Sequence, residues 1–287
     1  MPNYSKKLAV KPGTKIRLKD FDPCYHGKHG SRKSTLTEIE ENRQKMDELQ
    51  YLMYAENKHS LLVVLQGLDA AGKDGVVRHV FTGMNPEGCV AVNFKEPTPK
   101  ELAHDFLWRV HPHVPAKGSV VIFNRSHYED VLVARVHGLV PKKVWSKRYD
   151  EINDFEYLIV TENNTTILKF FLHISKDEQL ARFKKRLDNP TRQWKISESD
   201  YKEREYWGDY VKAFEDVLTK TSTDHAPWFI IPSNHKWFRD LAISQIIVRQ
   251  MEAMGMQFPK PTVNLAEIRR EYHQAASPDN GNQRKKR

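Results

Sequence analysis

Short apolar runs alternate along the chain with longer segments in which apolar and polar positions recur at helical spacing. The apolar runs are rich in β-branched and aromatic residues, which favours strands. Several are apolar throughout, as is typical of strands buried on both faces of a parallel sheet. The runs predict strands over residues 61–65, 90–94, 119–123, 165–174 and 228–231.

The segments between these strands predict helices. Two helix starts carry a capping-box pattern, Thr35 to Glu38 and Ser175 to Glu178. A third combines Thr98 as cap with Pro99 in the first turn. Helices are expected over about 35–57, 76–81, 98–111, 126–136, 141–162, 175–187, 198–218 and 235–254. Strands that alternate with helices indicate a parallel sheet between two helical layers.

The ends of the chain have a different composition from its middle. Residues 1–34 are basic and rich in turn-forming residues, and we expect an extended arm there. Residues 35–257 carry the alternating strands and helices and form the expected domain. Residues 258–287 are polar, and we expect this tail to be partly disordered, above all after Ala276.

The first strand leads into a glycine-rich turn with phosphate-binding spacing. Gly67 and Gly72 are five positions apart, and Lys73 opens the helical segment that follows. This is the order of a P-loop, in which backbone N–H groups and a helix N-terminus surround a phosphate. A lysine adds a mobile positive charge. The expected phosphate contacts are Gly67, Ala70, Ala71, Gly72, Lys73 and Asp74.

One position of this loop departs from the usual pattern. Asp74 stands where a P-loop normally has Ser or Thr, and Asp69 places a second carboxylate inside the loop. Two carboxylates would repel a bare phosphate, so we expect both to bind Mg²⁺, with Mn²⁺ as an alternative. The other interpretation is a glycine-rich turn with a capping aspartate.

The third strand ends in Asn124 and Arg125, at the sheet edge where open α/β folds bind ligands. Arg125 could bridge phosphates with its forked donors, or only cap the strand end. Asn124, His127 and Glu129 are the candidate nucleotide contacts. His127 could equally be a buried, hydrogen-bonded histidine, and Glu129 could be an acid at a helix N-terminus.

A dense basic stretch follows the fourth strand and is interrupted by Pro190. Such a run is often only a solvated face. Next to a P-loop, it indicates a lid over about residues 182–201 that closes on phosphates and excludes water. Arg182, Arg186 and Lys195 are its expected phosphate ligands. The predicted fold is P-loop kinase-like: a three-layer α/β/α fold with a five-stranded, mostly parallel sheet and a helical lid.

Charge adds a class of partner to this picture. The 287-residue chain has a formal net charge of +9, so a nucleic acid, a phosphorylated small molecule or a phosphate polymer would suit it. Its two cysteines favour reduced thiols over a disulfide or metal framework. Neither a signal peptide nor a membrane span is evident, so we expect a cytoplasmic protein without membrane contacts.

Three motifs together resemble the polyphosphate kinase 2 family. They are Gly67-Leu-Asp-Ala-Ala-Gly-Lys-Asp74, Phe123-Asn-Arg-Ser-His-Tyr-Glu-Asp130, and Arg186, Asn189-Pro190 and Trp194-Lys195-Ile-Ser197. Asn124, where many members have Asp, is most similar to the class III branch. The resemblance implies Mg²⁺-dependent phosphorylation of AMP and ADP by inorganic polyphosphate, in a homo-oligomer (dimer or tetramer).

The expected mechanism is phosphoryl transfer by positioning and charge neutralisation. The arm, the P-loop and the lid would line the polymer's path, and the acceptor's ionised phosphate oxygen needs no strong base. The candidate catalytic residues are Asp69, Lys73, Arg125 and Arg186. An ATP-dependent nucleoside monophosphate kinase is the first alternative, but it would normally carry Ser or Thr after Lys73. A nucleic-acid-binding P-loop protein is the second, although no stripe of aromatic and basic residues supports it.

Overall fold

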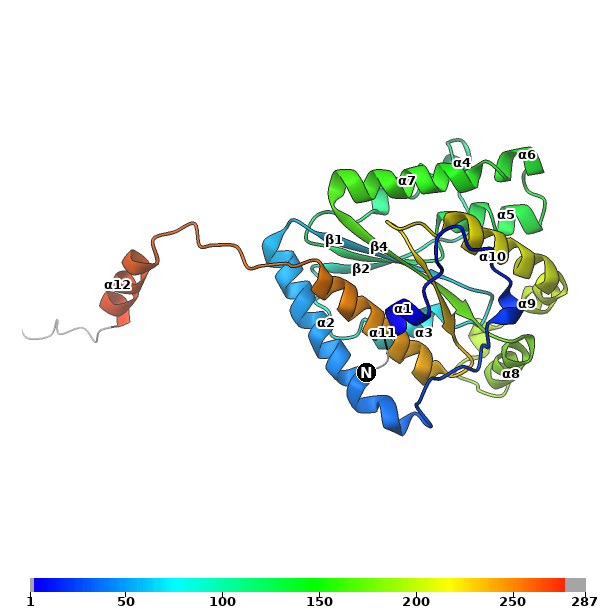
Figure 1. The fold of residues 1–287 in the computed structure, drawn as a ribbon, viewed down its shortest axis with the longest axis horizontal. Helices are drawn as coiled ribbons and strands as arrows, with labels where there is room; N and C mark the ends of the chain where they lie inside the picture. The colour runs from blue at the N-terminus through cyan, green and yellow to red at the C-terminus, as the bar shows by residue number, and fades with distance from the viewer. Residues whose placement is uncertain (1–2, 277–287) are drawn as a thin grey trace, which may run out of the picture. The chain divides into compact units, whose positions relative to one another are not determined.

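The structure, a computed structural model, describes residues 3–276. The chain divides into two compact units, a main unit up to Met256 and a C-terminal segment from Gln257. The main unit is a sheet with helices on both faces (Figure 1). The C-terminal segment contributes one described helix, α12 (Leu265–Ala276), which the sequence did not predict. The residues expected to be disordered after Ala276 lie outside the described range.

The sheet has the order β2-β3-β1-β4-β5, and every neighbouring pair of strands is parallel. All seven residues of β1 are buried, whereas β2 at the edge is partly exposed. The prediction of a five-stranded α/β fold is confirmed. The strands are β1 (Ser60–Gln66), β2 (Cys89–Asn93), β3 (Val120–Asn124), β4 (Thr165–His173) and β5 (Trp228–Pro232).

Two helical layers cover the sheet (Figure 1). One face is covered by α1 (Tyr4–Lys7), α2 (Leu36–Glu56), α3 (Lys73–Val80) and α11 (Lys236–Ala253). The other is covered by α5 (Val133–Val136), α6 (Lys142–Trp145), α7 (Arg148–Asn163) and α10 (Trp207–Thr221). The remaining helices of the main unit are α4 (Pro99–Leu102), α8 (Lys176–Leu187) and α9 (Glu198–Glu203). No helix among the described residues has the length and hydropathy of a membrane span.

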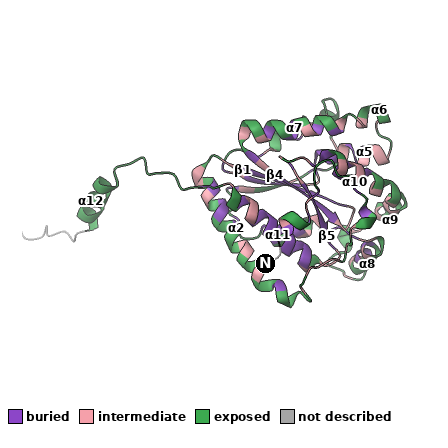
Figure 2. Ribbon diagram, viewed as in Figure 1, coloured by how far each residue is buried: buried purple, intermediate pink, exposed green. Residues whose placement is uncertain are grey.

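Alternate residues of β1 enter two separate hydrophobic cores. Leu61, Val63 and Leu65 belong to the core under α2 and α11. Leu62 and Val64 belong to the core under α7 and α10. The buried strands therefore lie between two buried helix faces (Figure 2), which explains why their sequences are mostly apolar on both faces.

The basic N-terminal segment packs along the outer edge of β5. Leu8 lies in the first core and Val10 in the second, so the segment crosses from one face of the sheet to the other. Ala9 forms an antiparallel bridge with Phe229. The Val10 N–H donates to the Trp228 carbonyl at 2.8 Å. The segment thus covers a strand edge that would otherwise be open.

Several predicted helix boundaries are wrong. The cap at Thr98 is confirmed, with a reciprocal bond from the Thr98 N–H to the Glu101 carboxylate at 2.7 Å. That helix ends at Leu102 rather than near residue 111. The Asp105 carboxylate accepts the N–H groups of Leu107 and Trp108, and such local bonds compete with a helix.

The two other predicted capping boxes do not form. The Thr35 hydroxyl donates to the Arg32 carbonyl at 2.9 Å, so it does not cap α2. Ser175 caps α8 through the Glu178 N–H, but the Glu178 carboxylate pairs with Arg182 instead of returning to the cap. Three predicted helices are interrupted. The helix expected over 126–136 begins as the 3₁₀ helix His127–Asp130 followed by a turn, the one over 141–162 is divided by a turn, and the one over 198–218 contains the 3₁₀ helix Arg204–Tyr206. The other 3₁₀ helices are Leu18–Asp20, Lys33–Thr35, His111–His113 and Gln193–Lys195.

Candidate active site

The order of the strands reverses at β1, which lies between β3 and β4. In open α/β sheets, ligands bind at the carboxyl ends of the strands beside such a reversal. Here those ends are Gln66, followed by the P-loop, and Asn124, followed by Arg125. Leu65 and Asn124 are partners in the strand register, so the two motifs begin side by side.

The P-loop turns through several left-handed backbone positions. Gly72 has a φ of 106° and Ala70 a φ of 61°. The turn brings the chain back to start α3 at Lys73. The first N–H groups of a helix lack partners within the helix, so this end of α3 is suited to accept a phosphate.

Lys73 is folded back over the loop. Its Nζ donates to the Gly67 carbonyl at 2.6 Å. Burial and the neighbouring Arg125 cation lower the pKa of Lys73 from its ordinary value. The Lys73 ammonium group therefore lies at the loop and near the Arg125 cation. Two neighbouring cations at a loop of this kind are suited to bind phosphate.

Arg125 bonds to Asp69 of the loop. The distance from Arg125 Nη2 to Asp69 Oδ1 is 3.1 Å, and both side chains are partly exposed. Arg125 has a φ of 61°, an uncommon conformation for a residue other than glycine that often marks functional sites. The left-handed turn aims Arg125 at the P-loop directly after β3.

Asp74 joins β3 to the lid. Its carboxylate accepts from Asn124 Nδ2 at 2.9 Å and pairs with Lys195 Nζ at 3.3 Å. Burial tends to raise the pKa of Asp74, but the Asn124 hydrogen bond and the Lys195 charge together lower it. Asp74 is thus held ionised, with residues of two other elements around it.

Arg186 faces its own lid segment. Its Nη1 donates to the Lys195 carbonyl at 3.4 Å and lies 3.8 Å from the Asp200 carboxylate. Burial raises the pKa of Asp200. The structure therefore brings Lys195 to the P-loop and keeps Arg186 in contacts within the lid.

Arg182 lies beneath the P-loop rather than in the open lid. Its side chain is 5% exposed and donates to the Ala70 carbonyl at 2.8 Å and to the Ala71 carbonyl at 2.7 Å. Burial lowers the pKa of this guanidinium. The structure therefore places Arg182, a predicted phosphate ligand, in a buried position against protein carbonyls.

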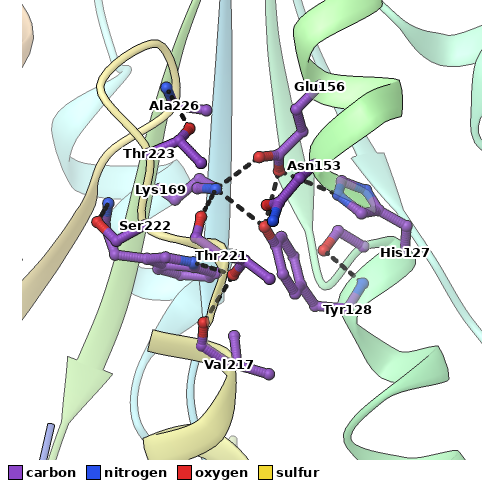
Figure 3. A network of polar contacts seen from close by, with 12 residues as sticks. His127, Tyr128, Asn153, Glu156, Lys169, Val217, Thr221, Ser222, Thr223 and Ala226 are labelled. Carbon is purple, nitrogen blue, oxygen red and sulfur yellow. Dashed lines mark hydrogen bonds and ion pairs between the residues drawn. The ribbon is translucent and has the colours of Figure 1, made fainter. Parts of the chain in front are cut away.

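His127 is buried, in agreement with the alternative interpretation of this residue. Its Nε2 lies 3.2 Å from Glu156, in a network that continues to Lys169 and Tyr128 (Figure 3). Lys169 Nζ donates to Glu156 at 2.5 Å and to the Tyr128 hydroxyl at 2.9 Å. Glu129 is partly exposed, and its charge acts on both Arg125 and Lys73.

This buried network supports the turn that carries Arg125. Ser126 accepts from the Tyr128 N–H and from Gln66 Nε2, each at 3.2 Å. Gln66 is the last residue of β1, and Tyr128 is fixed by Lys169. The network thus links the strand end before the P-loop to the turn after β3, a link that sequence spacing could not reveal.

The metal prediction depends on two carboxylates. Across residues 3–276, no three His, Cys, Asp or Glu side chains gather as an ion-binding group. Mg²⁺ commonly uses one or two carboxylates together with substrate phosphates and water. Asp69 and Asp74 on one phosphate-binding loop fit that ligand set.

Comparisons with known proteins agree with the three motifs. The family model for polyphosphate kinase 2 matches residues 29–259. An AMP/ADP-polyphosphate phosphotransferase of Meiothermus ruber is 49% identical over 257 residues, covering 89% of this chain and 96% of that protein. An ADP-polyphosphate phosphotransferase of Rhodopseudomonas palustris is 42% identical over 274 residues, covering 90% of this chain and 93% of that protein. The crystal structure of polyphosphate kinase 2 from Arthrobacter aurescens TC1 superposes with a TM-score of 0.91 at 39% identity, covering 95% of this chain and 97% of that one.

Proposed function

The chain belongs to the polyphosphate kinase 2 family, and from that premise we propose that it transfers phosphoryl groups from inorganic polyphosphate to AMP and ADP. Of the two relatives that match over nearly their whole length, one is named an AMP/ADP-polyphosphate phosphotransferase and the other an ADP-polyphosphate phosphotransferase. The observation that carries the proposal is the set of contacts around Asp74. An acid replaces the usual hydroxyl residue and meets both Asn124 and Lys195.

The donor polymer would bind where cations converge. Lys73 bonds to the P-loop at Gly67, Arg125 bonds to it at Asp69, and Lys195 comes from the lid. Arg125 presents two nitrogen donors to adjacent phosphate oxygens. These three cations would neutralise the charge that shifts between donor and acceptor during transfer.

The acceptor needs little help from a base. The terminal phosphate of AMP or ADP already offers an ionised oxygen near neutral pH, so positioning is the main requirement. Asn124 cannot take a proton, which is compatible with this chemistry. Its amide orients Asp74 through the 2.9 Å hydrogen bond.

Asp69 and Asp74 are the residues that would hold Mg²⁺, with Mn²⁺ as an alternative. When bound, the ion supplies positive charge to the phosphate oxygens at the transferring group. Arg125 now pairs with Asp69, and Lys195 with Asp74, at 3.1 and 3.3 Å. Both cations would move toward phosphate as the carboxylates turn to the metal.

The lid would close this site to water. Lys195 already reaches the P-loop, and Arg186 braces the Lys195 backbone through its 3.4 Å hydrogen bond. A closed lid prevents transfer to water in place of the nucleotide. In this conformation Arg186 would therefore contribute by holding the lid backbone at Lys195 in place, and not by direct contact with phosphate.

The test measures ADP and ATP formation from AMP and from ADP, with Mg²⁺ and either polyphosphate or ATP as the sole donor. We expect polyphosphate to serve as donor and Lys73→Ala to lose the activity. Lys45→Ala is the matched control, because Lys45 pairs with Glu48 at 3.1 Å on the exposed surface of α2. Transfer from ATP alone would make the protein an ordinary nucleotide kinase, and no transfer from either donor would reject both functions.

The family resemblance also supports a cytoplasmic homo-oligomer, a dimer or a tetramer. Sedimentation equilibrium across a concentration series measures its subunit number. A single species with the 33.6 kDa mass of one chain would count against this part of the proposal.

A further inference from the structure

The carbonyl groups of the P-loop have an unusual set of partners. Four consecutive carbonyls, those of residues 69–72, accept hydrogen bonds from side chains outside the loop. Gln179 Nε2 donates to the Asp69 carbonyl at 2.9 Å. Arg182 donates to the carbonyls of Ala70 and Ala71, and Arg239 Nη1 donates to the Gly72 carbonyl at 3.2 Å. We call Gln179, Arg182 and Arg239 the carbonyl brace.

The side chains of the carbonyl brace are buried. Gln179 is 3% exposed, Arg182 5% and Arg239 1%. Gln179 and Arg182 are three positions apart on α8 and so lie on one face of that helix. Arg239 approaches from α11, beyond the other end of the loop.

Each arginine of the brace has its own carboxylate. Arg182 Nε pairs with Glu178 at 2.7 Å. Arg239 donates through Nε and Nη2 to Asp240 at 2.8 and 2.7 Å. Because both charges are locally neutralised, the brace contributes directed donors more than net positive potential.

A peptide unit points its carbonyl and its N–H in opposite directions. When donors behind the loop hold the carbonyls, the N–H groups of the following residues face the other side. The Ala71 N–H donates to the Leu68 carbonyl at 3.0 Å, which leaves the N–H groups of residues 70, 72 and 73. We propose that Gln179, Arg182 and Arg239 are positioning residues that turn these three N–H groups toward the substrate phosphates. The inference rests on the proposed function and assigns these three residues a part in it.

The same brace reaches the segment that leaves the lid. Arg204 Nη1 donates to Gln179 Oε1 and to the Lys176 carbonyl, both at 2.9 Å. Arg182 also donates to the carbonyls of Ser233 and Asn234 after β5. Through Gln179, the position of the lid's return segment bears on the orientation of the Asp69 peptide.

Two glycines make room for Arg239. Gly72 has a φ of 106°, and a Cβ there would collide with Arg239 Nη1. Gly75 lies in the first turn of α3, where a Cβ would come within 3.1 Å of Arg239 Nη2 and 3.4 Å of Nη1. Gly75→Ala therefore presses on the guanidinium without removing any donor or acceptor.

The experiment compares Arg239→Met with Arg249→Met, a control ten positions further along the same helix and not among its buried residues. Calorimetry measures binding of tripolyphosphate, and steady-state kinetics with polyphosphate and AMP give kcat and KM. We expect Arg239→Met to bind tripolyphosphate at least about tenfold more weakly and to lose about 10²-fold in kcat/KM for polyphosphate, as misplaced groups do. The control should match the wild type, and the KM for AMP should change less than the KM for polyphosphate.

Gly75→Ala keeps the test usable if Arg239→Met folds poorly. Alanine is favoured over glycine inside a helix, so α3 should remain formed while the brace is displaced. We expect weaker tripolyphosphate binding in Gly75→Ala, and no further loss when it is combined with Arg239→Met. Such non-additivity marks residues that act through one contact.

The outcomes separate this inference from the proposed function. Wild-type tripolyphosphate binding in Gly75→Ala or in folded Arg239→Met would overturn the brace, even with full transfer activity in the wild type. A wild-type protein that transfers nothing from polyphosphate would reject the proposed function. Equal increases in the KM for AMP and in the KM for polyphosphate would also overturn the inference, because a general loss of structure predicts equal increases.

Discussion

Asn124→Asp would place two carboxylates where an amide now donates to Asp74. The present distance from Asn124 Nδ2 to Asp74 Oδ1 is 2.9 Å. Unit charges at that separation repel by about 1.4 kcal/mol in water and about 6 kcal/mol at an effective dielectric of ~20. The Asp74 side chain is 70% exposed, so the lower value applies. The variant should therefore lose roughly 3–6 °C in Tm without metal, at about 2–4 °C per kcal/mol.

Added Mg²⁺ should reverse this loss, since two adjacent carboxylates form a better metal ligand than one. Tenfold tighter binding would return about 1.4 kcal/mol at saturating metal. Thermal unfolding followed by fluorescence, first in EDTA and then along a Mg²⁺ series, measures both effects. Asn93→Asp is the matched control, because Asn93 pairs with Asn124 in the strand register but ends the neighbouring strand. Equal Tm values in EDTA for Asn124→Asp and wild type, with equal Mg²⁺ responses, would refute the reasoning.

Further predictions concern acceptor choice and the buried polar groups. Asn124→Asp should change the ratio of AMP to ADP use in competition assays, and an unchanged ratio would count against a role for Asn124 in acceptor choice. Lys169→Met should lower the free energy of unfolding at pH 7 by about 3–5 kcal/mol in urea titrations, because Glu156 keeps an unpaired buried charge. Burial raises the pKa of Glu156, but its partners, Lys169 first, lower it below its ordinary value. The difference in stability between the wild type and Lys169→Met should therefore shrink as the pH falls through that lowered pKa, because the wild type then loses the Lys169–Glu156 ion pair. Burial raises the pKa of Asp130 to about 6 despite Arg148. Stability should therefore fall as the pH rises from about 4 to about 6, and Asp130→Asn should flatten that slope in Tm against pH.

The sequence predicted those features that depend on neighbours along the chain. Apolar runs such as Leu61 to Leu65 identified all five strands, because a strand between two helical layers is mostly apolar on both faces. The spacing of Gly67, Gly72 and Lys73 identified the loop, and the acids at Asp69 and Asp74 led to the metal site, which stays a prediction. The match to the polyphosphate kinase 2 family confirms the resemblance that these motifs carry.

The errors arose where distant residues decide the structure. Arg182 belongs to a basic run, and only its contacts with the loop show that it is buried. Gln179 and Arg239 were not predicted, since neither lies in a motif and they approach from different helices. The apolar positions Leu8 and Val10 were a usable sign that the N-terminal segment packs into the fold. Their partners on β5 lie near the other end of the chain.

That long-range pairing has a consequence for how the protein is made. The Tyr4 N–H bonds to Gln245 Oε1, a residue 241 positions later. The segment around Tyr4 leaves the ribosome well before β5 and α11, yet it cannot pair until both have emerged. Contacts between such distant residues form slowly, and an unpaired β5 edge is exposed to association while they form. A fusion partner attached to residue 1 would thus be expected to slow the late step in which the N-terminal segment pairs with β5.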